Sequence, residues 1–103
     1  MRARKFGRVI NIASLAARQG ISTEGHYAAT KASVVTMTRV YAQEVGSDGI
    51  TVNAICPGII LTEMAKNKLV GADRDHWTNA TSLKRLGAPA DVAGAAVLIG
   101  SGN

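Results

Sequence analysis

Two stretches rich in β-branched residues, each closed by small or turn-forming residues, predict two buried strands. The first, G-R-V-I-N-I-A-S, ends at Ser14, and we expect a strand over residues 8–13. The second, I-T-V-N-A-I-C, predicts a strand over residues 50–56. Pro57-Gly58 ends it, because proline lacks a backbone donor and glycine allows a sharp turn. Continuous apolar runs of this length are typical of strands covered on both faces.

A helical repeat lies between the two predicted strands. Apolar residues recur there at spacings of three or four: Val34, Met37, Tyr41 and Val45. This pattern predicts a helix over residues 25–45. The helix follows a turn-like segment at 18–23, and we expect Gly46 and Gly49 to end it in left-handed conformations. A last helix is expected over residues 89–99, with a proline in its first turn.

The order strand, helix, strand predicts how the strands are paired. A connection that holds one helix makes the strands parallel, with a right-handed crossover. Their carboxyl ends then share one edge of the sheet, so we expect Ser14 beside Pro57-Gly58, where open parallel sheets bind ligands. The chain is therefore an α/β protein by prediction. Two parallel strands lack the neighbours that a stable sheet needs, so residues 1–103 are expected to form a single, partial domain.

The segment from about residue 62 to residue 86 is polar and mixed, which predicts a mobile flap with one or two short helices. Apolar side chains in this segment indicate one wall of a substrate site: Met64, Leu69, Val70 and Trp77. Trp77 is equally compatible with anchoring the flap. These residues indicate no particular substrate.

Composition fits one small globular domain, with 47% hydrophobic and 18% charged residues. No apolar run reaches the roughly 18 residues of a membrane span, so we expect no membrane partner. Met1–Arg8 lacks the apolar stretch of a secretory signal, and a cytoplasmic location is expected. Cys56 is the single cysteine, which excludes an internal disulfide, and the two histidines lack carboxylate or cysteine companions at ligand spacing. We therefore expect no metal site.

The net charge of +5 raises the question of nucleic-acid binding. Basic residues do cluster at the start of the chain: Arg2, Arg4, Lys5 and Arg8. Phe6 is the only aromatic residue among them, and the other basic side chains are scattered instead of forming one stripe. We expect no nucleic-acid partner. We interpret this basic cluster as a solvated end of the chain that is also suited to binding an anionic ligand.

Tyr27 and Lys31 stand four residues apart at the start of the predicted long helix, so they share one face. A free tyrosine has a pKa of about 10, and lowering it to about 7 requires roughly 4 kcal/mol in favour of the phenolate. A cation about 4 Å away, at an effective dielectric constant of about 20, supplies about that much. The Y-x-x-x-K spacing by itself is a weak signal, because many helices carry it by chance.

Four segments together make a stronger signal. They are Gly7–Ser14, Y-A-A-T-K-A at 27–32, G-I-T-V-N-A-I-C-P-G at 49–58 with Thr62 following, and R-L-G-A-P-A-D-V-A at 85–93. In this combination the chain resembles the short-chain dehydrogenase/reductase family over nearly its whole length, and in particular its members like the 3-oxoacyl-[acyl-carrier-protein] reductases. The resemblance implies part of a Rossmann-like doubly wound parallel sheet, with a strand–helix–strand unit, a flap and a C-terminal helix.

The resemblance implies an oxidoreductase that moves a hydride between NAD or NADP and a carbonyl or alcohol carbon of a small-molecule substrate. Tyr27 would exchange a proton with the substrate oxygen, and Ser14 would hydrogen-bond the same oxygen. Lys31 would lower the pKa of Tyr27 and hold the nicotinamide ribose together with it. Further cofactor contacts would come from Pro57, Gly58, Ile60 and Thr62. The helix that carries Tyr27 often packs against its copy in the family, which implies a homo-oligomer.

One part of the family pattern is missing from the sequence. The glycine-rich cofactor turn, T-G-x-x-x-G-x-G, does not occur, and the N-terminal half of the family's sheet has no counterpart. The cofactor's adenosine and pyrophosphate bind mainly to that half, so we expect no measurable activity from the chain alone. Two interpretations stay open. The chain is an oxidoreductase segment with a competent Ser-Tyr-Lys site, or a truncated non-catalytic fragment or assembly partner that binds no cofactor on its own.

Overall fold

The computed structural model describes residues 1–102, and within this range it describes every side chain except those of residues 64, 65 and 68. Two strands, five α-helices and two short 3-10 helices occupy this range. In chain order they are η1 (Arg2–Arg4), β1 (Gly7–Ile12), α1 (Ala16–Gln19), α2 (Gly25–Val45), η2 (Gly46–Asp48), β2 (Ile50–Ile55), α3 (Glu63–Lys68), α4 (Gly71–Ala80) and α5 (Pro89–Gly100).

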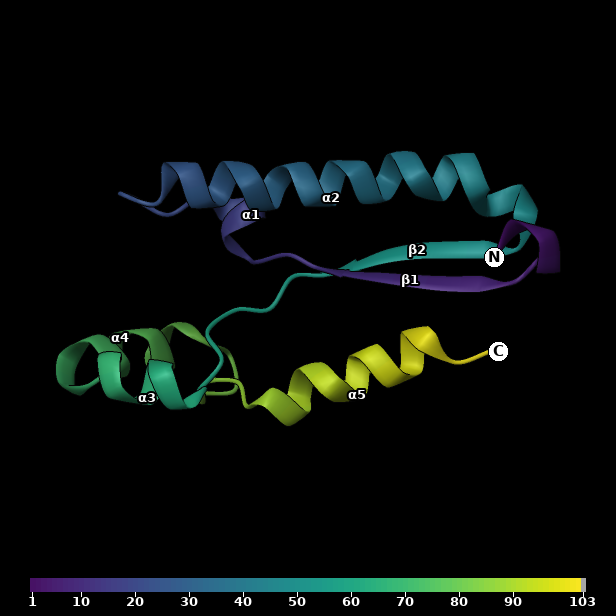
Figure 1. Cartoon of the computed structure of the whole chain (residues 1–103). Helices are drawn as coiled ribbons and strands as arrows, with labels where there is room; N and C mark the ends of the chain where they lie inside the picture. The colour runs from purple at the N-terminus through teal and green to yellow at the C-terminus, as the bar shows by residue number, and fades with distance from the viewer. Residues whose placement is uncertain (103) are drawn as a thin grey trace.

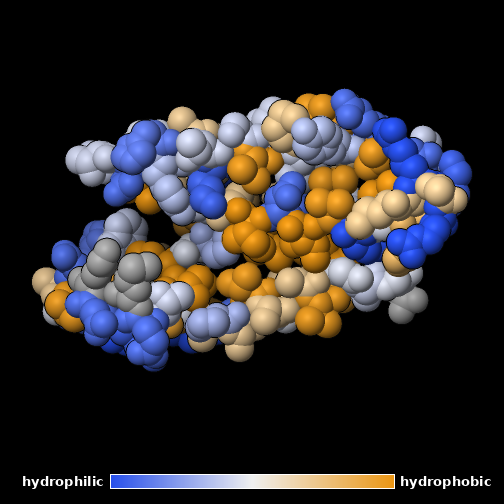
Figure 2. All heavy atoms as spheres, viewed as in Figure 1, coloured by the Kyte–Doolittle hydropathy of each residue, from blue (hydrophilic) through white to orange (hydrophobic). Residues whose placement is uncertain are grey.

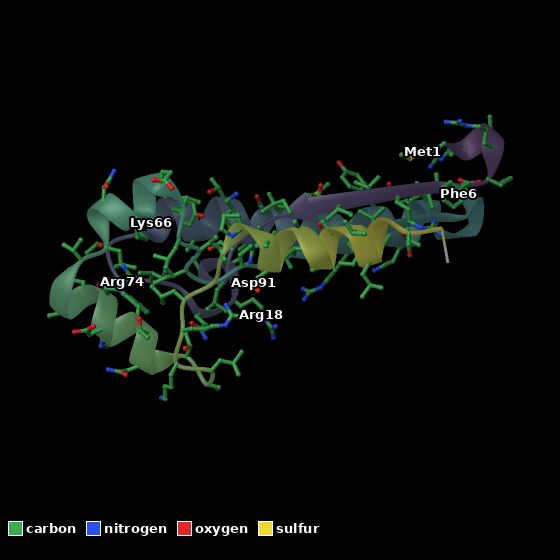
Figure 3. All side chains as sticks on the ribbon, turned by 90° about the horizontal axis from the view of Figure 1, so that it is seen from below. Met1, Phe6, Arg18, Lys66, Arg74 and Asp91 are labelled. Atoms are coloured by element: carbon green, nitrogen blue, oxygen red, sulfur yellow. The ribbon has the colours of Figure 1, made fainter. Side chains whose placement is uncertain are left out.

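The elements form three layers. Helix α2 covers one face of the two-stranded sheet, and α5 lies on the other face (Figure 1). The flap helices α3 and α4 lie beyond the carboxyl ends of the strands, at the far end of the molecule from both termini (Figure 1). Seen from below, Met1 and Phe6 mark one end, and Lys66 and Arg74 of the flap mark the other (Figure 3). The fold is elongated, with principal extents of 52 × 27 × 23 Å.

The strands pair in parallel, as predicted. The register runs from Gly7 opposite Ile50 to Ile12 opposite Ile55. Each strand ends one residue earlier than the sequence indicated, and β1 also begins one residue earlier. The pairing nevertheless continues past the end of β1, because the Ala13 N–H donates to the Ile55 carbonyl over 2.8 Å. Both strands therefore deliver their following loops to the same edge.

The prediction that both strands are buried on both faces is wrong. In β2 the side chains alternate, with Ile50 and Val52 buried but Thr51 and Asn53 exposed. Only Gly7 of β1 is buried. The physical reason is the width of the sheet. With two strands, each strand has one edge without a partner, and the single helix α5 cannot cover the face opposite α2.

Helix α2 has the predicted bounds, and one polar contact fixes it on the sheet. Asn11 of β1 donates from Nδ2 to Thr38 Oγ1 over 2.9 Å, and the Thr38 hydroxyl donates to the Val34 carbonyl over 2.7 Å. Thr38 is only 6% exposed. Buried polar groups must be hydrogen-bonded, so this pairing fixes which face of α2 meets β1.

The apolar layer between the helices and the sheet is thin. The buried apolar side chains in the described part of the chain are Ala13, Ala16, Ile50, Val52 and Leu86. Hydrophobic residues gather in the middle of the molecule, where α2, the sheet and α5 meet, while the two ends are largely hydrophilic (Figure 2). Val97 and Leu98 of α5 are each 75% exposed. Within residues 1–102, every helix is too short or too polar to traverse a lipid bilayer.

Three details of the connections differ from or extend the predictions. The segment at 18–23 was expected to be turn-like, but its first two residues belong to the one-turn helix α1. The flap contains two short helices, in agreement with the pattern, and α5 runs one residue further than predicted, to Gly100. Gly49 has a left-handed φ of 71°, whereas Gly46 is helical, with φ −58°. Gly46 continues into η2 instead of ending the helical path.

Replacement of Gly49 by alanine tests the link between η2 and the start of the sheet. A Cβ at Gly49 would collide with the Lys5 carbonyl oxygen, and the left-handed φ adds strain. We expect Gly49→Ala to lower the free energy of unfolding by more than about 1 kcal/mol, measured by urea denaturation. Gly46→Ala is the matched control, because a Cβ there meets no atom within 4 Å. Equal stability of the two variants would contradict the described turn.

Candidate active site at the carboxyl edge of the sheet

Two loops meet where the strands end. Ser14 follows β1 and Pro57-Gly58 follows β2, and the Leu15 N–H donates to the Pro57 carbonyl over 2.9 Å. This bond extends the parallel pairing into the loops. The expectation that Ser14 and Pro57-Gly58 lie side by side is therefore confirmed.

A cavity of about 670 Å³ opens at this edge. Its lining combines the strand ends, the α1 region and the flap: Ser14, Leu15, Ala16, Gln19, Gly20, Ile21, Ser22, Pro57, Gly58, Ile59, Trp77, Ala80, Thr81 and Leu86. The molecule is visibly hollowed between the upper helical layer and the flap (Figure 2). A volume of this size holds a small organic ligand, and apolar groups dominate its walls.

Tyr27 and Lys31 lie in the first turns of α2, and the structure brings them together. The Lys31 ammonium nitrogen is 5.8 Å from the centre of the Tyr27 ring. The same nitrogen donates to the Ile12 carbonyl over 3.3 Å, which ties the start of α2 to the end of β1, two residues before Ser14. Tyr27 is 40% exposed. Neither side chain lines the cavity, so the pair lies beside it and not within its walls.

The Ser14 side chain has a defined local role. Its Oγ accepts the backbone N–H of Ala16 over 3.1 Å, at the start of α1. This contact lies at the start of the helical turn that the sequence pattern missed, whose N-cap residue is Leu15. Accepting a bond uses a lone pair of Oγ, so the hydroxyl hydrogen is available to a ligand.

The two remaining predicted cofactor residues, Ile60 and Thr62, lie where the flap begins. Ile60 forms a parallel bridge with Gly87, where the flap ends. The Thr62 N–H donates to the Ile60 carbonyl over 2.9 Å, and the Thr62 carbonyl accepts the N–H of Lys66. The structure does not bring either side chain into the cavity lining.

The predicted apolar flap wall is represented in the cavity by Trp77, which is 39% exposed. Its ring meets that of His76 edge to face, with 5.1 Å between centroids. Leu69 and Val70 do not line the cavity, and the side chain of Met64 lies outside the described residues. Sequence reasoning did not single out Leu15, Ile21 and Leu86, which do line it. Their apolar character within loops was the available signal.

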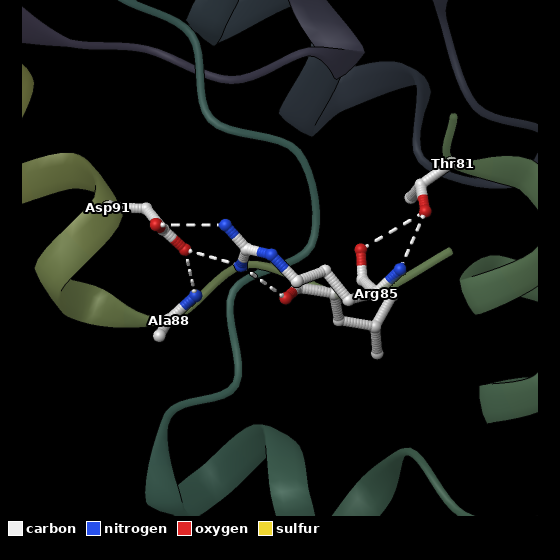
Figure 4. A network of polar contacts seen from close by, with 5 residues as sticks. Thr81, Arg85, Ala88 and Asp91 are labelled. Carbon is white, nitrogen blue, oxygen red and sulfur yellow. Dashed lines mark hydrogen bonds and ion pairs between the residues drawn. The ribbon is translucent and has the colours of Figure 1, made fainter. Parts of the chain in front are cut away.

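A polar network fastens the end of the flap to α5 (Figure 4). Arg85 Nη1 lies 2.9 Å from Asp91 Oδ2, and Nη2 lies 3.2 Å from Oδ1. The backbone N–H of Ala88 also donates to Asp91 Oδ2 over 2.8 Å. The hydrogen bonds from Arg85 and Ala88 lower the pKa of Asp91 to about 2. Both charged residues lie in the segment 85–93 that resembles the family, and no role for them was predicted from the sequence.

The basic cluster at the start of the chain is partly neutralised within the fold. Arg2 and Lys5 form ion pairs with Asp48 at 3.1 Å and 2.9 Å. The hydrogen bond from Lys5 lowers the pKa of Asp48. The Arg8 guanidinium stacks over the Phe6 ring at 4.5 Å. These contacts hold the chain together at the end opposite the cavity. In the described part of the chain, no group of three or more His, Cys, Asp or Glu side chains could hold a metal ion.

Comparison with known proteins identifies the class. The family model described as enoyl-(acyl carrier protein) reductase matches residues 1–103. The acetoacetyl-CoA reductase of Rhizobium meliloti is 40% identical over 101 residues, which cover 98% of this chain and 42% of that protein. A 3-oxoacyl-[acyl-carrier-protein] reductase of Synechocystis is 39% identical over 94 residues, covering 91% of this chain and 36% of the relative. The chain belongs to the short-chain dehydrogenase/reductase family.

Solved structures agree with this assignment. ElxO with NADP bound superimposes on this chain with a TM-score of 0.91 at 28% sequence identity. The match covers all of this chain and 42% of the ElxO chain. The 3-oxoacyl-[acyl-carrier protein] reductase of Brucella melitensis gives a TM-score of 0.88 at 34% identity, with 99% of this chain and 38% of that chain covered. The chain thus has the fold of part of a Rossmann-like sheet. It spans about two fifths of the length of these proteins.

The Arg85–Asp91 pair predicts a specific response to acid. The folded-state pKa of Asp91 is about 2, below the value of about 3.9 expected in the unfolded chain, so the pair stabilises the fold above about pH 4. This contribution is lost as the pH falls from about 4 towards 2. Asp91→Asn should therefore lower Tm at pH 7, and the difference from the unmodified chain should close towards pH 2.

Thermal unfolding followed by circular dichroism at a series of pH values measures this effect. Asp75→Asn serves as the control, because Asp75 has no ion pair within the described residues and should cause no comparable loss at neutral pH. A difference between the unmodified chain and Asp91→Asn that stayed the same from pH 7 to pH 2 would contradict the assignment.

Proposed function

We propose that this chain is the catalytic segment of a nicotinamide-dependent carbonyl reductase, with Ser14, Tyr27 and Lys31 as its catalytic residues. One observation carries the proposal. The Lys31 ammonium lies 5.8 Å from the centre of the Tyr27 ring and donates to the carbonyl of Ile12, the last residue of β1, two residues before Ser14. Family membership gives this arrangement its chemical meaning.

Each residue has a role that its contacts support. Tyr27 supplies a proton to the substrate oxygen during reduction and takes one back during oxidation. Lys31 places its positive charge 5.8 Å from the centre of the Tyr27 ring, and the start of α2 adds the positive end of the helix dipole. Because an ammonium has three donors and one reaches Ile12, two are left for neighbouring oxygens. The Ser14 hydroxyl hydrogen is directed to the same substrate oxygen.

The cofactor we propose is NAD or NADP. When bound, a reduced nicotinamide supplies the hydride that a carbonyl carbon accepts. The residues present fit the nicotinamide end of this group. Tyr27 and Lys31 would hold the ribose hydroxyls, and Pro57, Gly58, Ile60 and Thr62 would line the nicotinamide side and the nearby phosphate. The first solved structure above has NADP bound, and a tyrosine-to-phenylalanine variant of ElxO has NADPH bound, so NADPH is the cofactor to test first.

For the substrate we propose a 3-oxoacyl thioester. Several of the relatives are named as reductases of acetoacetyl-CoA or of 3-oxoacyl-acyl carrier protein. The cavity supports this class, because Leu15, Ile21, Trp77 and Leu86 offer an apolar surface to an acyl chain, while Ser14 offers a polar group at one side.

An alternative is that the chain by itself is a non-catalytic fragment or an assembly partner. The open edges of both strands and the thin apolar layer favour this alternative for the isolated chain. A homo-oligomer formed through α2 is a related proposal, supported by the exposure of Met37, Val40 and Tyr41 on that helix. The homo-oligomer proposal leaves the assignment of the catalytic residues unchanged, whereas a non-catalytic fragment would have no catalytic residues of its own.

A hybrid enzyme tests the proposed catalytic residues. The chain would replace the matching segment of the Rhizobium meliloti acetoacetyl-CoA reductase, which supplies the rest of the fold. We expect the hybrid to reduce acetoacetyl-CoA with NADPH, whereas the 103-residue chain alone should show no measurable turnover. Tyr27→Phe should lower kcat of the hybrid about 10²–10⁴-fold, because the proton donor is lost while the ring remains.

Tyr41→Phe is the matched control, since Tyr41 is the only other tyrosine and lies on the same helix. It should leave kcat unchanged. Equal losses in the two variants would remove the support for Tyr27 as the proton donor. A folded hybrid that turned over no substrate would favour the non-catalytic alternative, and turnover by the isolated chain would overturn the expectation that the rest of the fold is required.

A further inference from the structure

The two ends of the flap are fastened together at its base. The Leu61 N–H donates to the Gly87 carbonyl over 2.8 Å, and the Gly87 N–H donates to the Ile59 carbonyl over 2.9 Å. A Cβ at Gly87 would meet the end of the Ile60 side chain, so the two ends of the flap approach each other closely here. Ile59 lines the cavity. The base of the flap is therefore attached to the loop that follows β2.

Arg85 and Asp91 clamp this base to α5 (Figure 4). Their contact is bidentate, with the two nitrogen–oxygen pairs at 2.9 Å and 3.2 Å. The same carboxylate accepts the Ala88 N–H and so caps the start of α5, while Arg85 Nη1 also donates to the Leu86 carbonyl over 3.3 Å. Because the planar guanidinium of Arg85 is held at several points, both its orientation and its distance relative to Asp91 are fixed.

The backbone of Arg85 continues the connection to α4. Thr81, directly after α4, accepts the Arg85 N–H through Oγ1 over 3.1 Å, and its hydroxyl lies within donating distance of the carbonyls of Thr78, at 2.9 Å, and Arg85, at 3.1 Å. Trp77 stands four residues before Thr81, one helical turn away. Thr81, Trp77 and Leu86 all line the cavity, but Arg85 and Asp91 do not. The clamp thus reaches the cavity wall through α4 and touches no ligand itself.

We propose that Arg85 and Asp91 are positioning residues that hold α4 at the cavity, beyond the carboxyl ends of the strands, and keep Trp77 in the cavity wall. The functional consequence of this clamp, that it shapes the site for the acyl chain of the substrate, rests on the proposed function. Loss of the clamp lets α4 move outward and exposes the indole. In the hybrid enzyme, the KM for acetoacetyl-CoA then rises several-fold, while kcat changes little.

Trp77 is the only tryptophan, so its fluorescence reports the position of the flap without any ligand. Acrylamide quenching of the 103-residue chain is the test. Asp91→Asn and Arg85→Lys should each raise the Stern–Volmer constant about twofold, because an indole that is 39% exposed approaches full exposure. Arg85→Lys keeps the positive charge and the hydrogen bond between Asp91 and the Ala88 N–H. It therefore tests the bidentate Arg85–Asp91 contact separately from any disturbance of α5 that Asp91→Asn causes.

Two controls separate positioning from general loosening. Glu63→Gln removes an ion pair with Lys66 within α3 that takes no part in the clamp, and Asp48→Asn removes the ion pairs at the opposite end of the sheet. Neither should change the quenching of Trp77. Unchanged quenching in both clamp variants, or an equal increase in the controls, would overturn the proposal. Because the fluorescence needs no turnover, failure of the proposed function would instead appear as a hybrid without activity and with the clamp effect intact.

Discussion

The parallel pairing of β1 and β2 is the interaction on which the rest of this structure depends. Its register places Ile12 opposite Ile55, and the bond from Leu15 to Pro57 carries the pairing into the loops. Each loop then has a fixed partner at the carboxyl edge. A shift by one residue would turn every side chain of a strand to the other face and separate Ser14 from the Pro57-Gly58 turn.

Three further contacts convert this edge into a candidate site. Lys31 reaches back to the Ile12 carbonyl, so the first turns of α2 are aligned with the end of β1. On the opposite side, the Ile60–Gly87 bridge and the Arg85–Asp91 pair hold the flap over the cavity. The thin core explains why these polar contacts matter. With few buried apolar residues, directional bonds determine how the layers are oriented.

Local patterns predicted the elements better than they predicted burial. The apolar spacing from Val34 to Val45 indicated the full extent of α2, and the two β-branched runs indicated a parallel pair. Burial of Thr51 and Asn53 could not be judged in this way, because it depends on which helices cover the sheet. The helix α1 was missed because it is only one turn long and Gly20 made the segment resemble a turn. The Arg85–Asp91 contact spans a loop, and no periodicity reveals such a pair.

The central claim is that the carboxyl edge, with Ser14, Tyr27 and Lys31, forms one ligand site in this chain. Titration of the ¹⁵N-labelled chain with NADPH, followed by two-dimensional NMR, tests it most directly. Our account predicts weak binding whose amide shift changes concentrate in residues 12–15, 27–31 and 57–62. Changes confined to the basic residues 2–8, or no change at the carboxyl edge at high NADPH concentration, would contradict it.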